Sequence, residues 1–201
     1  MCNLGIDLDN TIIDYSYSLS NLARFEYGIS LERSSNLKKQ LKDLLISRYT
    51  ENEWTRAQGL LYSNYINSAS PYDGFLMSIK ELKPIFNNIY IVSHKTKFPY
   101  TGGKVDLRDK AKNWIMTELV SDNGTPIFKD TEVFFELTID DKIHRINELQ
   151  CDVFIDDLPE ILFQLPASLE RILFGAKMDE SQLKNFENWH ELKRYLLEKY
   201  R

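Results

Sequence analysis

The sequence predicts an α/β fold: a doubly wound parallel sheet with a small α-helical segment inserted after its first strand. Two observations predict the sheet. Short apolar runs alternate along the chain with stretches of helical periodicity, and the runs themselves do not alternate polar with apolar residues. A third observation predicts the insertion. Residues 12–70 lie between Thr11, just past the first apolar run, and Pro71, where the chain returns to the core, whereas a parallel crossover needs only about a dozen residues.

The predicted strands are five short runs rich in β-branched and aromatic residues. They cover residues 4–8, 89–92, 133–135, 153–155 and 171–175. Continuous apolar character is typical of a strand that is covered on both faces. The runs therefore favour the interior of one parallel sheet.

The predicted core helices are four stretches with apolar residues at helical spacing. They cover residues 74–86, 106–119, 139–149 and 186–200. Because strands and helices alternate, the crossovers should be right-handed and the helices should cover both faces of the sheet.

The insertion is itself helical, with apolar periodicity over residues 17–27, 36–49 and 53–67. We therefore divide the chain into a core of residues 1–14 and 71–201 and a helical cap of residues 15–70. The alternative is that these helices only thicken the cover of the sheet. A lid is favoured because the insertion follows a strand that ends in candidate functional residues.

Composition restricts the class of protein. Of the 201 residues, 43% are hydrophobic, which is typical of a globular chain, and the formal charge of −5 argues against binding a nucleic acid polymer or an anionic membrane by charge. Two cysteines are too few for a disulfide scaffold or a zinc finger. Since residues 1–10 resemble no signal peptide and no apolar run suits a membrane span, we expect a cytoplasmic protein without membrane or nucleic-acid partners.

Polar side chains stand where three of the predicted strands end. Asp7 and Asp9 end the first strand, Ser93 ends the second, and Asp156 and Asp157 end the fourth. Ligands of open α/β sheets bind at the carboxyl ends of the strands. We therefore expect these side chains to meet at one edge of the sheet.

Four carboxylates at one edge would repel one another unless a cation joined them. Such a site suits Mg²⁺, which accepts one or two protein carboxylates together with substrate phosphate. Lys142, near the start of the helix before the fourth strand, would add a positive charge. These groups favour a site that neutralises a phosphoryl group while an aspartate attacks it.

Residues 5–11, Gly-Ile-Asp-Leu-Asp-Asn-Thr, resemble the first motif, DxDxT, of the haloacid dehalogenase-like (HAD) hydrolase superfamily. Ser93, Lys142 and the pair Asp156-Asp157 resemble the second, third and fourth motifs, in the order of that superfamily. The insertion stands where the superfamily has its C1 cap, and the chain is similar to capped phosphatases, including 5'-nucleotidase-like members.

The resemblance implies a role for each matching residue. Asp7 would be the nucleophile and Asp9 the general acid and base. Thr11 and Ser93 would hold the phosphate, and Lys142 would bridge nucleophile and phosphate.

The resemblance also implies the ligands of Mg²⁺. They would be Asp7, the main-chain carbonyl of Asp9, and either Asp156 or Asp157. We favour Asp156, which is nearer the strand end.

The loop after Ser93 is polar and basic, with His94, Lys95 and Lys97. Such a loop beside the site could hold a second anionic group of the substrate, and we include His94 and Lys95 among the candidate binding residues. A solvated surface loop is the alternative.

These observations favour a Mg²⁺-dependent phosphatase that hydrolyses a small phosphorylated metabolite, a nucleotide or a sugar phosphate, through an aspartyl-phosphate intermediate. Asp9 favours ester hydrolysis, because an acid there can protonate a leaving alkoxide and then activate water. One alternative is a phosphomutase or phosphotransferase of the same superfamily. Another is a non-catalytic phospho-receiver or binding module, although in a receiver the acidic pair comes first along the chain.

Overall fold

The computed structural model describes residues 2–32, 34, 36–101, 103–175 and 183–201. The chain divides into two compact units. The first contains Met1–Ile13, Pro71–Lys95 and Leu119–Arg201, and the second contains Asp14–Ser70 and Thr96–Glu118. The second unit thus includes residues 96–118, which the sequence-based division assigns to the core.

The first unit is built on a sheet of six parallel strands in the order β5-β4-β1-β6-β7-β8. The strands are β1 (Asn3–Ile6), β4 (Asn88–His94), β5 (Val133–Glu136), β6 (Val153–Asp156), β7 (Glu170–Phe174) and β8 (Lys184–Phe186). The predicted parallel α/β class is confirmed. In chain order, the strands after β1 are first added on one side of it, as β4 and β5, and then on its other side, beginning with β6. The strand order therefore reverses beside β1. This reversal is where α/β proteins form their ligand crevice.

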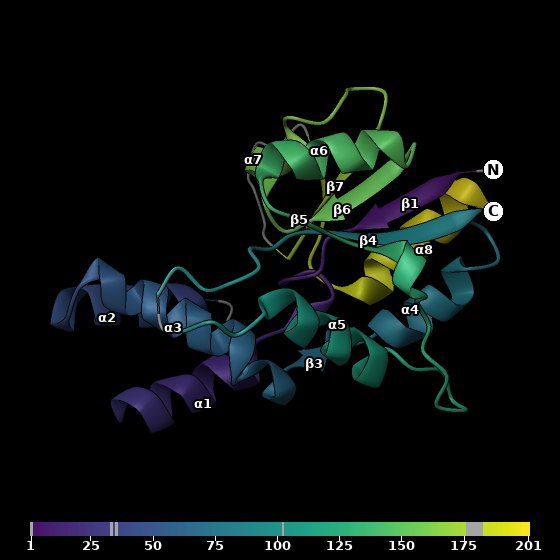
Figure 1. Cartoon of the computed structure of the whole chain (residues 1–201). Helices are drawn as coiled ribbons and strands as arrows, with labels where there is room; N and C mark the ends of the chain where they lie inside the picture. Colours follow the sequence, from purple (N-terminus) through teal and green to yellow (C-terminus); the bar gives the residue numbers. More distant parts are fainter. Residues whose placement is uncertain (1, 33, 35, 102, 176–182) are drawn as a thin grey trace. The chain divides into compact units, whose positions relative to one another are not determined.

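Helices cover both faces of this sheet (Figure 1). On one face α6 (Ile139–Glu148) contacts β4 and β5, and α7 (Pro159–Leu162) contacts β6 and β7. On the other face α4 (Phe75–Leu82) packs against α8 (Trp189–Tyr200). The core of the first face includes these fully buried residues: Val92, Ile146, Phe154, Leu162 and Leu173. The core of the second face includes an edge-to-face pair, Phe75 and Trp189, whose ring centroids lie 4.9 Å apart.

The start of the last helix differs from the prediction. Residues 186–200 are predicted as one helix, but Phe186 belongs to the short strand β8 and the helix begins at Trp189. Asn188 provides the reason, because its side chain accepts a hydrogen bond from the backbone N–H of Glu191 and so caps the helix. With one apolar residue in three, β8 has too weak a pattern to be predicted as a strand.

The second unit is helical. It contains α1 (Ser16–Tyr27), α2 (Leu37–Arg48), α3 (Glu51–Ser63), the 3₁₀ helix η1 (Ile66–Ser68) and α5 (Leu107–Glu118). The predicted insertion helices occur close to their predicted places. The indole of Trp114 in α5 donates a hydrogen bond to the carbonyl of Ala69, 3.1 Å away, which helps to explain why α5 groups with the insertion.

The chain passes between the units through β2 (Ile13–Asp14) and β3 (Ser70–Pro71), which pair with each other. The other two passages are at residues 95–96 and 118–119. Among the described residues, the helices are all too short or too polar to span a membrane.

Candidate active site

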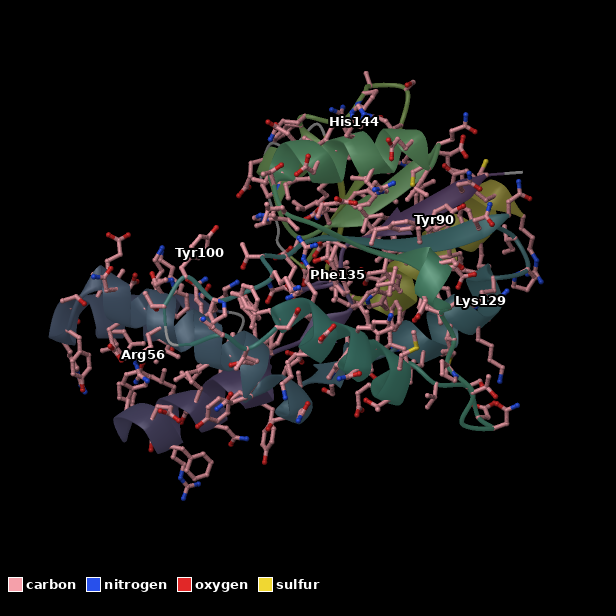
Figure 2. All side chains as sticks on the ribbon, in the orientation of Figure 1. Arg56, Tyr90, Tyr100, Lys129, Phe135 and His144 are labelled. Atoms are coloured by element: carbon pink, nitrogen blue, oxygen red, sulfur yellow. The ribbon has the colours of Figure 1, made fainter. Side chains whose placement is uncertain are left out.

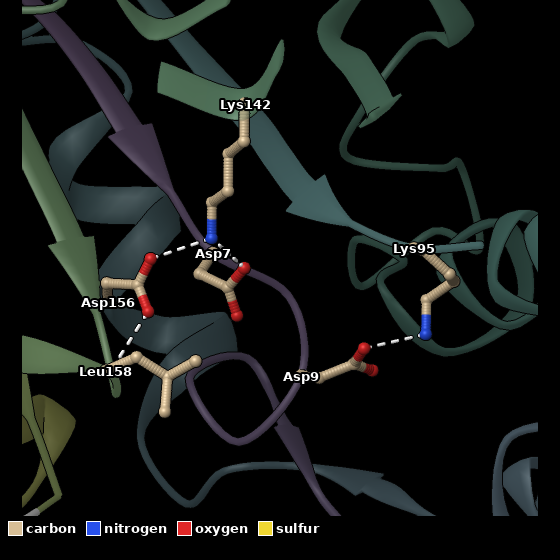
Figure 3. A network of polar contacts seen from close by, with 6 residues as sticks. All are labelled: Asp7, Asp9, Lys95, Lys142, Asp156 and Leu158. Carbon is tan, nitrogen blue, oxygen red and sulfur yellow. Dashed lines mark hydrogen bonds and ion pairs between the residues drawn. The ribbon is translucent and has the colours of Figure 1, made fainter. Parts of the chain in front are cut away.

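A buried ion cluster lies at the carboxyl edge of the sheet (Figure 3). The Nζ atom of Lys142 lies 2.6 Å from Oδ1 of Asp7 and 2.7 Å from Oδ2 of Asp156. All three side chains are buried. Residues that are distant in the sequence thus meet at the edge where the sequence places a site.

Strand register brings the two aspartates together. Ile6 of β1 is paired with Ile155 of β6, and the backbone N–H of Asp7 donates to the carbonyl of Ile155 at 2.8 Å. Asp7 and Asp156 therefore follow equivalent positions of two adjacent parallel strands.

The first turn of α6 supplies the lysine. Thr138 caps this helix by accepting a hydrogen bond from the N–H of Asp141, 3.0 Å away. Lys142 is buried and its ammonium contacts Asp7 and Asp156. His144, on the same helix, points outward, and its side chain is 82% exposed (Figure 2).

Burial and charge shift the pKa values of the cluster. Burial raises the pKa of Asp7 well above its ordinary value; Lys142 counteracts this rise in part, and the neighbouring carboxylates, Asp156 first, add to it. Burial lowers the pKa of Lys142, but the charges of Asp7 and Asp156 and their hydrogen bonds outweigh burial and raise it overall. Lys142 is therefore held in its charged form, whereas burial opposes the negative charge of Asp7.

The cluster has the donors for a hard divalent cation. Asp7, Asp156 and Asp157 each offer a carboxylate oxygen, and these oxygens lie within 4.8 Å of one another. Three ionised carboxylates, two of them buried against the ammonium of Lys142, would leave two negative charges uncompensated. An ion such as Mg²⁺ would compensate them, so the residues fit the predicted metal.

Asp9 is held separately from this cluster. Its Oδ2 lies 2.6 Å from Nζ of Lys95, and the two side chains are 17% and 3% exposed. In Figure 3 the Asp9 carboxylate is turned toward Lys95 and away from Asp7. The sequence predicted that four carboxylates would converge. In the structure, three of them lie together beside Lys142 of α6, and the fourth, that of Asp9, forms a separate ion pair with Lys95.

A tight turn after β1 fixes where Asp9 stands. The backbone N–H groups of Ile12 and Ile13 both donate to the carbonyl of Leu8, at 3.0 and 2.9 Å. Asn10 adopts φ 60°, a left-handed conformation that asparagine tolerates better than most residues. The Asn of the DxDNT segment therefore has a backbone role.

The other candidate residues are held by contacts of their own. Ser93 is buried near the end of β4. The Nε2 atom of His94 lies 2.9 Å from the carbonyl oxygen of Leu137. Thr11 is fully buried, and its hydroxyl oxygen has no hydrogen-bond partner among the described residues. Lys97 is 60% exposed, and its ammonium lies 3.6 Å from a carboxylate oxygen of Asp106.

Sequence reasoning missed two neighbours of the cluster. The ring of Phe154 lies with its centroid 5.4 Å from Nζ of Lys142, and the N–H of Leu158 donates to Oδ1 of Asp156 at 3.0 Å. It also missed the pairing of Lys95 with Asp9. The signal for that pairing was only the place of Lys95, two residues beyond a strand-end serine.

No family model matches the chain. A curated protein of Bacillus cereus named "Putative nucleotidase" is 24% identical over 161 residues, which cover 79% of this chain and 77% of that protein.

Solved structures with the same fold include a predicted phosphatase from Clostridium acetobutylicum, with a TM-score of 0.61 and 16% identity over 98% of each chain. A haloacid dehalogenase-like hydrolase family protein from Streptococcus pneumoniae has a TM-score of 0.59 and 14% identity, again over 98% of each chain. The fold and the site are those of an open α/β protein with an acidic cluster at the carboxyl edge of its parallel sheet. This chain has the fold of haloacid dehalogenase-like hydrolases, and the predicted fold is confirmed.

Proposed function

We propose that this protein is a Mg²⁺-dependent phosphatase that hydrolyses small phosphate monoesters through an aspartyl-phosphate on Asp7. The observation that carries the proposal is the buried cluster of Asp7, Lys142 and Asp156 beside the strand-order reversal at β1. The hydrolase and phosphatase descriptions of proteins with the same fold support an enzyme of this kind.

In the first step, a carboxylate oxygen of Asp7 attacks phosphorus and forms a new O–P bond. The bond between phosphorus and the ester oxygen breaks, and protonated Asp9 gives its proton to the leaving alkoxide. Lys142 supports this step because its ammonium, 2.6 Å from Asp7, orients the nucleophile and offsets charge on the phosphoryl oxygens.

In the second step, water attacks the phosphorus of the aspartyl-phosphate and gives a proton to the Asp9 carboxylate. The O–P bond to Asp7 breaks, orthophosphate leaves, and Asp9 is protonated for the next turnover. One residue therefore acts as acid and then as base. Asp7, Asp156 and Asp157 would hold the divalent ion, which when bound supplies positive charge that stabilises the negatively charged phosphoryl group.

We propose mononucleotides as the first substrates to test. The name of the Bacillus cereus relative supports this choice. The helical unit, Asp14–Ser70 with Thr96–Glu118, is proposed to act as the cap that restricts the site to small esters.

The proposal is tested by a screen of nucleoside monophosphates and sugar phosphates with phosphate release as the readout. Wild type with Mg²⁺ should turn over at least one of these classes, and EDTA should stop the reaction until Mg²⁺ is restored. Asp7→Asn should lower kcat by on the order of 10⁴-fold or more.

Asp122→Asn is the matched control. Asp122 is an exposed carboxylate paired with Lys80 at 2.6 Å, outside the site, and its variant should keep wild-type rates. Metal-independent turnover, or an Asp7→Asn variant that retains more than a trace of wild-type kcat, would contradict the proposal.

A further inference from the structure

We propose that Lys95 is a positioning residue: its ammonium holds the Asp9 carboxylate apart from the Asp7 cluster, where Asp9 can reach the leaving-group oxygen of the substrate. The inference rests on the proposed function and adds a residue that none of the four motifs contains.

The geometry of the pair is the first argument. Nζ of Lys95 lies 2.6 Å from Oδ2 of Asp9, and the lysine side chain is only 3% exposed. A buried ammonium is costly unless a counter-charge accompanies it, and the Asp9 side chain supplies that partner here. The contact is therefore more than a surface ion pair, which would be too weak to fix a side chain.

The backbones at both ends of the pair are anchored. The N–H of Lys95 donates to the carbonyl of Glu136 at 2.9 Å, which extends the β4–β5 ladder by one residue. Asp9 forms a bridge with Ile13 inside the turn that follows β1. Both residues belong to the first unit. A charge pair between two anchored backbones restricts the rotamers of Asp9, as positioning of an acid requires.

The position of Asp9 in the chain explains why it needs such a partner. It stands two residues after Asp7, whose cluster already contains the Lys142 ammonium and an excess of carboxylates that suits a divalent ion. Without Lys95, these cations would be the alternative partners for the Asp9 carboxylate. A carboxylate drawn to them would occupy the space that the phosphoryl group and its leaving oxygen need.

This role differs from the one expected from the sequence, where Lys95 would hold a second anionic group of the substrate. The two roles predict different kinetics. A lysine that binds substrate affects every ester that carries the anionic group, and mainly KM. A lysine that positions the acid affects kcat, and affects it most where the leaving group needs a proton.

The test compares single-turnover cleavage of an alkyl phosphate identified in the screen with that of p-nitrophenyl phosphate, whose leaving group needs no proton. Lys95→Met should slow alkyl-ester cleavage by about 10²-fold, change nitrophenolate release by less than about threefold, and leave KM nearly unchanged. Lys95→Arg, which keeps the charge, should recover most of the rate. Adding Lys95→Met to Asp9→Asn should cost less than about threefold more.

Lys193→Met is the matched control, because Lys193 pairs with Glu81 at 2.7 Å away from the site and should be replaceable without kinetic effect. Equal loss on both esters, a change in KM alone, an undiminished loss in the Asp9→Asn background, or no loss at all would overturn the proposal. An inactive wild type would instead refute the proposed function. A crystal structure of Lys95→Met then tests the positioning directly, since an Asp9 carboxylate that has not moved would overturn it.

Discussion

Lys142 places its ammonium nitrogen 2.6 Å from Oδ1 of Asp7, a residue 135 positions away in the chain. The two groups come from different elements, the end of β1 and the first turn of α6. Their contact joins the helix layer to the carboxyl edge of the sheet. The carboxylate of Asp7, the proposed nucleophile, is therefore held in place by its contact with Lys142 inside a cluster of charged groups.

Replacing Lys142 by methionine should destabilise the metal-free protein. The change leaves the buried carboxylates of Asp7 and Asp156 without their ammonium, and breaking a buried pair from one side costs about 3–5 kcal/mol. Urea unfolding in EDTA measures the loss. Lys193→Met, at a partly exposed pair, should change the free energy of unfolding by no more than about 1 kcal/mol. A loss of similar size in both variants would contradict this account of the cluster.

Asp7→Asn should change how the stability of the metal-free protein depends on pH. Burial raises the pKa of Asp7 well above its ordinary 3.8, so above about pH 4 the folded state keeps a proton that the unfolded state releases. The contribution of Asp7 to the free energy of unfolding of the wild type is therefore largest at low pH. It is lost as the pH rises toward the pKa of Asp7 in the folded state.

The asparagine variant has no such proton to keep, so it should gain stability over wild type as pH rises, by at most about 1.4 kcal/mol per pH unit. Denaturant unfolding of both proteins in EDTA across this range gives the difference directly. A difference that stays constant with pH would show that burial does not raise this pKa.

Gly5→Ala should destabilise the sheet next to the site. A Cβ at Gly5 would stand 2.5 Å from Cδ2 of Phe154, closer than such contacts allow, and 3.0 Å from Sγ of Cys151, which is a tight contact. The ring of Phe154 must move to relieve this clash, and overpacking of this kind lowers the free energy of unfolding by about 1–3 kcal/mol. Because Phe154 also packs against Lys142, kcat should fall as well.

A second substitution tests the cause. Phe154→Leu makes room for the new Cβ, so the double variant should be less destabilised than the sum of the two single changes. Simple additivity in thermal or urea unfolding would show that the contact with Phe154 is not the source of the strain.

The sequence by itself determined the class of fold and the edge at which the site lies. Continuous apolar runs predicted strands covered on both faces, and the polar residues after them, Asp7 and Asp156 above all, predicted convergence at the carboxyl edge. These properties follow from local periodicity and from the geometry common to all parallel sheets, so a single chain reveals them.

Only the tertiary structure decided which charges pair. It separated Asp9 from the three-carboxylate group and gave it Lys95, and it placed Phe154 beside Lys142. It also grouped α5 with the inserted helices, where Trp114 bonds to Ala69, and formed β8 from a segment with almost no strand signal. The physical reason is that ion pairs, ring contacts and edge-strand ladders depend on distances between segments far apart in the chain, which composition and periodicity do not encode.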